Sequence, residues 1–310
     1  MQTIKKIIKN PRKIFVYMGS MGMLNWMPDK IYLKIVFRAI MGYKLDLKNP
    51  QTFSEKLQWI KINMRDPLWT KLVDKYEVKK YVGNIIGEEY IIPNLGIYEK
   101  FEEINFEALP RQFVLKCTHD SGGLIICKDK ENLNFEEAEK KIKRSLGKNY
   151  FYWGREWPYK DVKPRIICEK YISDSNSLPD DYKVVCFNGK AKLIQIHRGR
   201  YENHTQDIYD VEWNKTDISQ DNMISNIEFN KPKELNLMIE LSEKLSRGIP
   251  QVRVDWFIVQ NKLYFGEITF FDGSGMYPFD KFEHDKLLGD WIELGINNLM
   301  ENSNETEYIK

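Results

Sequence analysis

The chain has 310 residues, of which 42% are hydrophobic and 13% aromatic, and this composition excludes an intrinsically disordered protein. A chain of this length can bury a substantial core in one large or two modest domains. The 47 Lys and Arg residues nearly balance the 45 Asp and Glu residues. No overall field therefore attracts nucleic acid or anionic lipid, and we expect anions to be bound by local groups of cations.

The first 28 residues form a basic and then apolar segment. An apolar stretch at 14–27 follows five cations: Lys5, Lys6, Lys9, Arg12 and Lys13. That stretch is too short to span a bilayer, and no small-x-small cleavage site follows it. We expect segment 1–28 to dock on the protein or on a membrane surface rather than to act as a secretory signal.

The next region, 29–110, is expected to be helical because apolar residues recur at helical spacing. The expected helices lie at 31–36, at 53–60 with Thr52 or Ser54 as the cap, and at 68–81, which contains Asp74-Lys75-Tyr76.

The pattern then changes to short β-rich runs between turn signals, for which we expect a small subdomain at 111–180 and a large subdomain at 181–310. Helices followed by antiparallel strands interleaved with helices predict the α+β class. The expected strands are 113–119, 124–127, 165–172, 182–187 and 190–198 around Asn188-Gly189, and 253–259 and 262–269 around Asn261; the expected helices are 134–146, 232–247 and 281–299.

The cysteines stand singly within apolar runs and lack the spacing of zinc ligands. We interpret them as small buried residues of a reducing compartment, which predicts a cytoplasmic protein, in peripheral contact with the inner face of the membrane if segment 1–28 binds there. They are Cys117, Cys127, Cys168 and Cys186.

The second hairpin carries the most informative pair of residues. If its loop is centred on Asn261, Asp255 lies opposite Glu267, and Arg253 lies opposite Thr269. Opposite side chains of an antiparallel pair have Cβ atoms about 4.5–5.5 Å apart, so two carboxylates meet on one face. Facing carboxylates require a proton or a cation between them, and Mg²⁺ with nucleotide phosphates meets that demand. The alternative is an edge hairpin with a wet carboxylate face.

A lysine and a glycine turn form a second candidate feature. Lys116 ends an apolar strand, and its charge together with free backbone N–H groups suits phosphates. The turn is not a Walker A loop, because it enters a strand rather than a helix, and a purely structural turn is an equally good interpretation. The same alternative holds for His119. The turn consists of Ser121, Gly122 and Gly123.

Further charged residues accompany these two features. Glu169 lies near the end of an apolar strand and can accept from a ribose hydroxyl, although it can equally be a surface charge. Pairing about Asn188-Gly189 predicts that Lys183 and Arg198 share one face of the first hairpin, with Arg200 further along it. Cations on one sheet face match a polyphosphate, and a charged outer face is the alternative.

The order of these motifs resembles the ATP-grasp superfamily, and more closely its TupA-like branch, named for teichuronopeptide biosynthesis. The resemblance covers most of the chain from about Asp29 onward. It rests on Asp74-Lys75-Tyr76, on 113–119 and 181–189, on Arg253-Val254-Asp255 and on 264–270.

The resemblance implies an ATP-grasp fold in which ATP lies between two α+β subdomains. Lys75 and Lys116 would contact its phosphates, and the strand end formed by Glu169, Lys170, Tyr171 and Ile172 would hold adenine and ribose. Lys183 and Arg198 would approach the γ-phosphate, and Arg253 would stabilise the tetrahedral intermediate. Asp255 and Glu267 would bind magnesium. Many superfamily members have Glu-x-Asn where this chain has Glu267-Ile268-Thr269. Thr269 is a poorer metal ligand than an amide carbonyl, and Asp272 is a candidate substitute.

The implied reaction is ATP-dependent activation of a carboxylate, followed by attack of an amine on the acyl phosphate. The family context points to bacterial surface polysaccharide, such as a capsule, with a hexuronic acid as the acid and an amino acid as the amine. An ATP-grasp-like kinase, a glycosyltransferase and a degenerate binding module are the alternatives. The loop at 173–180 and the aromatic stretch at 150–157 are candidate acceptor contacts, although the stretch can equally be a packed lid.

Overall fold

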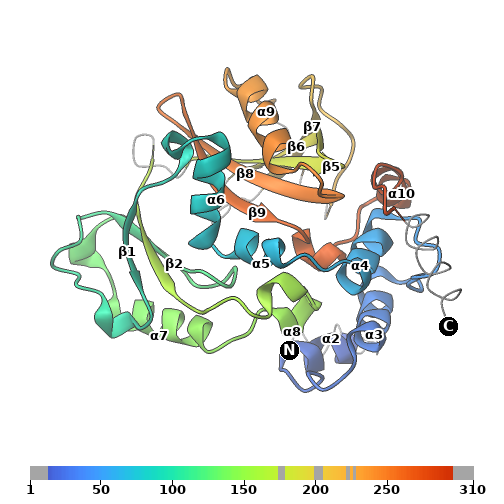
Figure 1. The fold of residues 1–310 in the computed structure, drawn as a ribbon, viewed down its shortest axis with the longest axis horizontal. Coiled ribbons are helices and arrows are strands. Elements are labelled where there is room, and N and C mark those ends of the chain that lie inside the picture. The colour runs from blue at the N-terminus through green and yellow to red at the C-terminus, as the bar shows by residue number, and fades with distance from the viewer. Residues whose placement is uncertain (1–12, 174–178, 199–204, 221–223, 226–227, 296–310) are drawn as a thin grey trace, which may run out of the picture.

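The N-terminal part of the chain is built from helices, as its apolar spacing predicts (Figure 1). The computed structural model describes residues 13–173, 179–198, 205–220, 224–225 and 228–295. Within that part of the chain, no helix is long and apolar enough to cross a membrane. The first helices are α2 (Lys13–Ser20), α3 (Asp29–Met41), α4 (Phe53–Asn63), α5 (Pro67–Val73) and α6 (Glu77–Ile86).

The helix expected at 68–81 is in fact two helices. Asp74 interrupts it, because its side chain accepts hydrogen bonds from the backbone N–H of Tyr76 at 2.8 Å and of Glu77 at 3.3 Å. An Asp side chain that binds the following N–H groups starts a new helix instead of continuing the old one. The break leaves Lys75 at the N-terminal end of α6, where it can point away from both helices.

A four-stranded antiparallel sheet follows, in the order β1-β4-β2-β3. Helix α7 (Phe135–Leu146) packs on it and contributes Ile142 to the core beneath the sheet. Strand β1 belongs to this sheet although it lies in region 29–110, which was expected to be helical. The strands are β1 (Asn94–Tyr98), β2 (Phe113–Cys117), β3 (Leu124–Cys127) and β4 (Ile166–Lys170).

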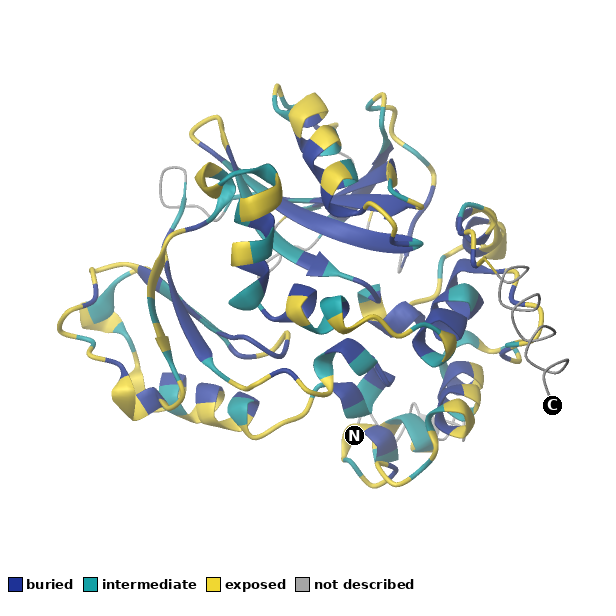
Figure 2. Cartoon of the chain, viewed as in Figure 1, coloured by how far each residue is buried: buried dark blue, intermediate teal, exposed yellow. Residues whose placement is uncertain are grey.

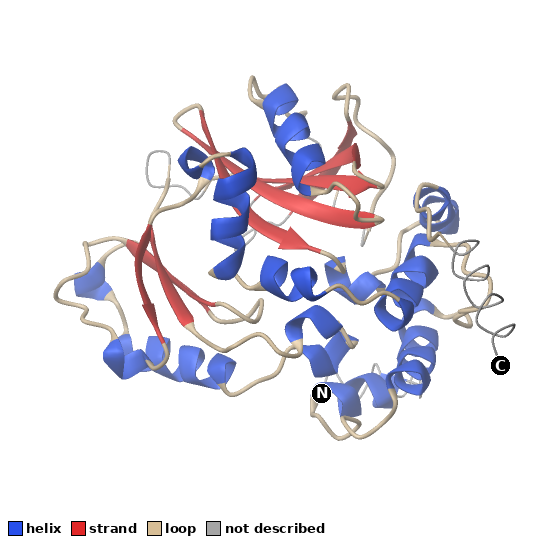
Figure 3. Ribbon diagram, in the orientation of Figure 1, coloured by secondary structure: helices blue, strands red, loops and turns tan. Residues whose placement is uncertain are grey.

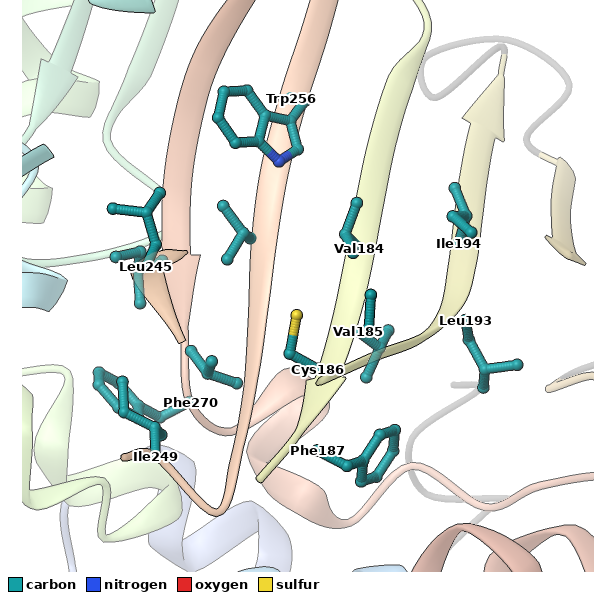
Figure 4. Packing of buried hydrophobic residues seen from close by; sticks show 14 of the residues in the cluster. Val184, Val185, Cys186, Phe187, Leu193, Ile194, Leu245, Ile249, Trp256 and Phe270 are labelled. Carbon is teal, nitrogen blue, oxygen red and sulfur yellow. The ribbon is translucent and has the colours of Figure 1, made fainter. Parts of the chain in front are cut away.

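A five-stranded antiparallel sheet forms the centre of the molecule, in the order β7-β6-β5-β8-β9. Helix α9 (Leu235–Leu245) covers one face, and Trp256 on that face donates to the Ser242 hydroxyl at 2.8 Å. Figure 4 shows the apolar side chains of this core, and Figure 2 shows that β8 is mostly buried whereas much of β9 has intermediate exposure. The strands are β5 (Asp181–Phe187), β6 (Lys190–Arg198), β7 (Thr205–Asp210), β8 (Gln251–Val259) and β9 (Lys262–Thr269).

The two expected hairpins are present, and both turn through two residues with positive φ. Asn188 and Gly189 have φ of 49° and 77°, as the Asn-Gly signal predicts. Gln260 and Asn261 have φ of 52° and 56°, and Val259 pairs with Lys262. The centre of the second loop therefore lies between Gln260 and Asn261, and not on Asn261 as the sequence prediction assumed.

Separate helical and antiparallel layers confirm the α+β class (Figure 3). The four cysteines are free and buried, as expected. Thr52 rather than Ser54 caps α4, in a capping box with Glu55. The shorter elements are α8 (Phe151–Gly154) and α10 (Phe282–Asp290), and the 3-10 helices η1 (Glu88–Tyr90), η2 (Phe101–Glu103), η3 (Lys130–Asn132), η4 (Trp157–Tyr159) and η5 (Asp272–Gly275).

The contact between α10 and the start of α4 leaves no room for a side chain at Gly289. A Cβ there would lie 2.7 Å from the backbone nitrogen of Phe53. We expect Gly289→Ala to destabilise the fold by about 1–3 kcal/mol, because backbone must move. The measurement is the urea unfolding midpoint, with Gly147→Ala as the control, since that Cβ would meet nothing closer than 3.6 Å. Equal midpoints for the two variants would contradict the packing described here.

Candidate active site

The two sheets bring charged side chains together where β2 approaches β5, β8 and β9. Lys116 of the small sheet interacts electrostatically with Glu267 and Asp181 of the large sheet. Helices α5 and α6 lie between the sheets (Figure 1), and Lys75 at their junction is 3.8 Å from Glu267. These residues therefore form a single cluster built from both sheets.

Arg253 lies at the centre of the cluster with its side chain 6% exposed. Its guanidinium contacts Asp255 through Nε at 2.7 Å and Nη2 at 2.9 Å, and Asp272 through Nη1 at 2.5 Å. It also lies 3.4 Å from Glu267. Burial would lower the pKa of Arg253, but the surrounding carboxylates raise it well above its ordinary value. The cation expected between facing carboxylates is therefore, in this structure, an arginine of the same strand.

A β-bulge brings Glu267 to that position. Arg253 pairs with Thr269 as predicted, but Trp256 pairs with Phe265, so Gly266 and Glu267 together lie opposite Asp255. Glycine suits this position, since a Cβ at residue 266 would lie in tight contact with the Asp255 carbonyl oxygen, at 3.0 Å. The assumed loop centre was wrong. The bulge nevertheless restores the predicted pairing of Arg253 with Thr269, at the end of the hairpin that carries the site.

Lys183 lies beside Asp255 on the neighbouring strand and is 1% exposed. Its ammonium forms ion pairs with Asp255 and, at 2.8 Å, with Asp181. Burial raises the pKa of Asp255, and Arg253 and Lys183 offset only part of that effect. Burial also acts to raise the pKa of Glu267, but Lys75 and Arg253 outweigh it and hold this pKa at about 2. The surroundings thus raise the pKa of Asp255 and lower the pKa of Glu267.

Glu169 and Lys116 are close together in the structure. Lys116 lies 2.6 Å from Glu169, and Lys79 lies 2.5 Å from it on the other carboxylate oxygen. Burial would raise the pKa of Glu169, but these two lysines lower it to about 2. Lys79 was not among the predicted site residues, because within α6 it has the sequence pattern of an ordinary surface lysine.

The glycine turn is held by its own neighbours. Gly123 donates to Asp120 at 3.1 Å, and Asp120 also binds the Ser145 hydroxyl. His119 is buried with Nε2 at 3.2 Å from two backbone carbonyls, those of Ser145 and Lys148, which supports its interpretation as a turn residue. Ser121 and Gly122 are exposed and stay candidates for phosphate contacts.

Arg198 does not share a face with Lys183, which corrects the sequence prediction. A register shift between Val185 and Cys186 pairs Lys183 with Gln195. Residues alternate in direction along a strand, so His197 points to the Lys183 face and Arg198 to the other. Arg198 pairs with Asp180 at 2.7 Å and lies 4.1 Å from the Phe229 ring centroid. Arg200 lies outside the described residues.

The strand end expected to hold adenine has mixed exposure. Lys170 is exposed and Ile172 half-buried, whereas Tyr171 is 8% exposed. Within the described chain the Tyr171 hydroxyl has no hydrogen-bond partner. Residues 174–178 of the candidate acceptor loop lie outside the described part.

Three consecutive left-handed residues follow Asp272: Gly273, Ser274 and Gly275, with φ of 52°, 58° and 58°. Lys61 of α4 fixes this turn by donating to the Ser274 carbonyl at 2.7 Å and to the Gly154 carbonyl at 2.7 Å. Burial lowers the pKa of Lys61 to about 8, and Glu156 opposes that shift. This network was not predicted, because Lys61 and Ser274 are 213 residues apart in the sequence and meet only in the folded chain.

The aromatic stretch at 150–157 is packed rather than free. Arg155 is 2% exposed, donates to the Leu24 carbonyl at 2.8 Å and lies 4.3 Å from the Tyr32 ring centroid. Tyr150 packs edge-on against Tyr159 at 4.9 Å. Arg155 therefore ties this stretch to helix α3 and to the segment before it.

The oxygen donors around Arg253 fit magnesium by their chemistry. Three carboxylates and the Thr269 hydroxyl are hard ligands of the kind that Mg²⁺ binds. Glu267 and Asp272 have side chains 39% and 43% exposed, so both are reachable, whereas Asp255 is occupied by Arg253 and Lys183. In the described ranges, no group of three or more His, Cys, Asp or Glu side chains is already arranged around a metal position.

Comparisons with known proteins give one family and a set of solved structures. A family model described as TupA-like ATPgrasp matches residues 55–293. The D-alanine–D-alanine ligase of Bacillus anthracis, complexed with ATP, is 19% identical over 64% of this chain and 53% of that chain, with a TM-score of 0.38. A RimK domain ATP-grasp protein of Sphaerobacter thermophilus is 11% identical over 72% and 69%, with a TM-score of 0.41.

A third structure, the D-alanine–D-alanine ligase of Helicobacter pylori, is 15% identical over 72% of this chain and 61% of that chain, with a TM-score of 0.37. The match thus spans little more than half of the length of these two ligases. A search of curated proteins gave no match.

The buried cluster of Glu169 with Lys79 and Lys116 predicts a pH-dependent stability. The folded-state pKa of about 2 lies below the ordinary value of 4.5, so the stabilisation is present above about pH 4.5 and is lost as the pH falls through 2. We expect Glu169→Gln to cost about 3 kcal/mol at pH 7, with the difference from the unchanged protein narrowing below pH 4.5. Urea unfolding at pH 7, 5 and 3.5 measures this difference in unfolding free energy, with exposed Glu136→Gln as the control. A difference that stays constant down to pH 3.5 would refute the assignment.

Proposed function

This chain belongs to the TupA-like ATP-grasp family, and from that membership we propose that it is an ATP- and magnesium-dependent ligase that joins a carboxylate to an amine. The observation that carries the proposal is the buried Arg253, which contacts Asp255, Glu267 and Asp272 beside Lys183. ATP would lie between the small subdomain (111–180) and the large subdomain (181–310), above this cluster and the N-terminal helical region.

The charges of the cluster favour binding of nucleotide together with metal. Four cations, Lys75, Lys116, Lys183 and Arg253, are matched by four carboxylates, Asp181, Asp255, Glu267 and Asp272. Because these formal charges cancel, the cluster offers no excess positive charge to a polyphosphate. A magnesium ion held by Glu267 and Asp272, with Asp255 and Thr269 beside them, would neutralise phosphate charge during transfer.

The lysines would bind the phosphates. Lys75 and Lys116 come from the helical side and the small sheet, and Lys183 comes from the large sheet, so the three approach from different elements. Ser121, Gly122 and Gly123 would add backbone N–H donors, and His119 would hold their turn. The strand end at 169–172 would contact adenine and ribose. Glu169 would orient Lys116 in this arrangement.

The reaction would proceed in two balanced steps. A carboxylate oxygen of the acid attacks the γ-phosphorus and the bond to the β-phosphate oxygen breaks, which gives an acyl phosphate and ADP. The amine then attacks the acyl carbon, phosphate leaves and the amine loses a proton. Arg253 would stabilise the negative charge that develops on the tetrahedral intermediate, and Lys183 would stabilise the transferred phosphoryl group. The family context supports a hexuronic acid and an amino acid of surface polysaccharide, such as a capsule, as substrates.

An ADP-release assay with uronic acids and amino acids tests this function. We expect ADP and free phosphate only when ATP, magnesium, acid and amine are all present, because a kinase would leave phosphate on the acceptor. Asp255→Asn and Glu267→Gln should each lower kcat about 100-fold or more. Arg198→Ala, on the opposite sheet face, should change kcat by no more than about twofold. Full activity of both carboxylate variants would refute the proposal, and binding of UDP-sugars in place of ATP would indicate a glycosyltransferase.

We further propose that the N-terminal segment binds the surface of an anionic membrane from the cytoplasmic side. Apolar side chains are exposed together after α2: Met21 is 59%, Met23 55% and Trp26 78% exposed. The cations that precede them in the sequence complement anionic lipid, and an apolar surface next to basic residues is typical of interfacial segments.

Vesicle sedimentation tests this membrane contact. The protein should sediment with phosphatidylserine-containing vesicles. The double variant Met23→Ser with Trp26→Ala should bind about tenfold more weakly, because it has less apolar surface to bury in the membrane. Leu237→Ser, an exposed apolar position on α9, serves as the control and should bind unchanged. Failure of the unchanged protein to sediment would contradict the proposal.

A further inference from the structure

The turn that carries Asp272 has a backbone that needs support from its surroundings. Gly273, Ser274 and Gly275 are all left-handed, which is unfavourable for a residue with a Cβ such as Ser274. A Cβ at Gly275 would lie 2.8 Å from the Leu57 side chain, so the turn also lies directly against α4. A backbone of this kind persists only where other contacts fix it.

Two buried side chains of α4 supply such contacts through the carbonyl groups of the turn. Lys61 donates to the Ser274 carbonyl at 2.7 Å. Gln58 donates to the same carbonyl at 3.2 Å and to the Gly275 carbonyl at 2.9 Å. Lys61 also donates to Oε1 of Gln58 at 3.0 Å, so each of the two side chains orients the other.

The hydrogen-bonding capacity of Lys61 is fully used in this network. An ammonium has three donors, and the third one binds the Gly154 carbonyl at 2.7 Å. The Ser274 side chain is held as well, because its hydroxyl donates to the buried carboxylate of Glu156. Loss of the ammonium would therefore leave three buried acceptors without this donor, and the turn would lose its main polar contact with α4.

The position of the Asp272 carboxylate depends on this backbone. The Asp272 side chain is 43% exposed and contacts Arg253, which Asp255 and Glu267 also contact. As a magnesium ligand, Asp272 would share its oxygen atoms between the metal and Arg253, so Arg253 alone cannot fix it. The contacts of Lys61 do not involve the carboxylate, and they would remain when a metal is bound. Magnesium demands ligands in near-ideal octahedral positions, so the placement of each oxygen matters.

We propose that Lys61 is a positioning residue of the active site, which fixes the left-handed turn and thereby places Asp272 for magnesium. Gln58 supports it through the same carbonyl. The assignment rests on the proposed function for the role of Asp272 as a metal ligand. The N-terminal helical region would thus contribute to the metal site through the backbone of a turn near the other end of the chain.

Binding of Mn²⁺, a probe for magnesium, tests the assignment without any turnover. The Kd is measured on the full chain by electron paramagnetic resonance, with and without ADP. Lys61→Met keeps the aliphatic stem, removes the ammonium and should weaken Mn²⁺ binding about tenfold. Gln58→Leu should weaken binding in the same direction, and it decides the outcome if Lys61→Met does not fold.

A matched control is available on the same helix. Lys56 donates to the carbonyls of Gly289 and Ile292, both at 2.9 Å, and so ties α4 to a different part of the chain. Lys56→Met should change the Kd for Mn²⁺ by no more than about twofold, although it also removes a lysine that binds carbonyls. Thermal unfolding of each variant shows whether it is folded.

A double variant separates positioning from a general structural effect. Asp272→Asn should weaken Mn²⁺ binding about tenfold, and addition of Lys61→Met should weaken it no further, because the residue that Lys61 places is already lost. Full multiplication of the two losses would overturn the positioning role.

The remaining outcomes distinguish this role from the ligase function. Mn²⁺ binding that depends on Lys61 and Asp272, in a protein that releases no ADP, would keep the positioning role and reject the ligase function. ADP release by a protein whose folded Lys61→Met and Gln58→Leu variants bind Mn²⁺ unchanged would keep the ligase function and overturn the positioning role. Absence of Mn²⁺ binding by the unchanged protein would overturn the positioning role as well.

Discussion

The candidate active site depends on the burial of one guanidinium. Arg253 is almost fully enclosed, and a buried cation must be paired if the fold is to be stable. Three carboxylates from β8, β9 and η5 meet that requirement, and a different local feature of the backbone positions each of them. Asp255 shares the strand, Glu267 arrives through a bulge, and Asp272 is delivered by a left-handed turn. The geometry of the site therefore follows from the need to pair this buried cation within the large sheet.

Much of this arrangement could be predicted from the sequence, because the signals are local. Alternation of apolar and charged residues placed Asp255 and Arg253 on one face, and Asn188-Gly189 marked its hairpin correctly. The family resemblance is confirmed over residues 55–293. The two bulges were not predicted, although a glycine inside a strand, such as Gly266, is a sequence signal for a bulge. The bulge in the second hairpin preserves the expected pairing of Arg253 with Thr269. The register shift in the first hairpin places Arg198 on the sheet face opposite to Lys183.

Long-range contacts account for the remaining misses. Lys79 and Lys61 look like ordinary surface lysines of helices, yet both are buried and bind groups far away in the chain. Nothing in the helix around Lys61 indicates the Ser274 carbonyl, which is more than two hundred residues distant. Strand β1 was missed for a similar reason, because its pairing partner β4 stabilises it more than its own five residues do.

The packing of Met276 bears on how such a protein can be recombined. This residue directly follows the left-handed turn, and it belongs to a core formed with Tyr32, Leu33 and Phe37 of α3. Helix α3 lies before the stretch that the family model matches, so the unit recognised by homology is smaller than the unit that folds. An exchange of the leading helices between relatives would disturb the geometry of Asp272 unless the residues after the turn were exchanged with them. The N-terminal helices are therefore not an independent module, and their inheritance is coupled to that of the far end of the chain.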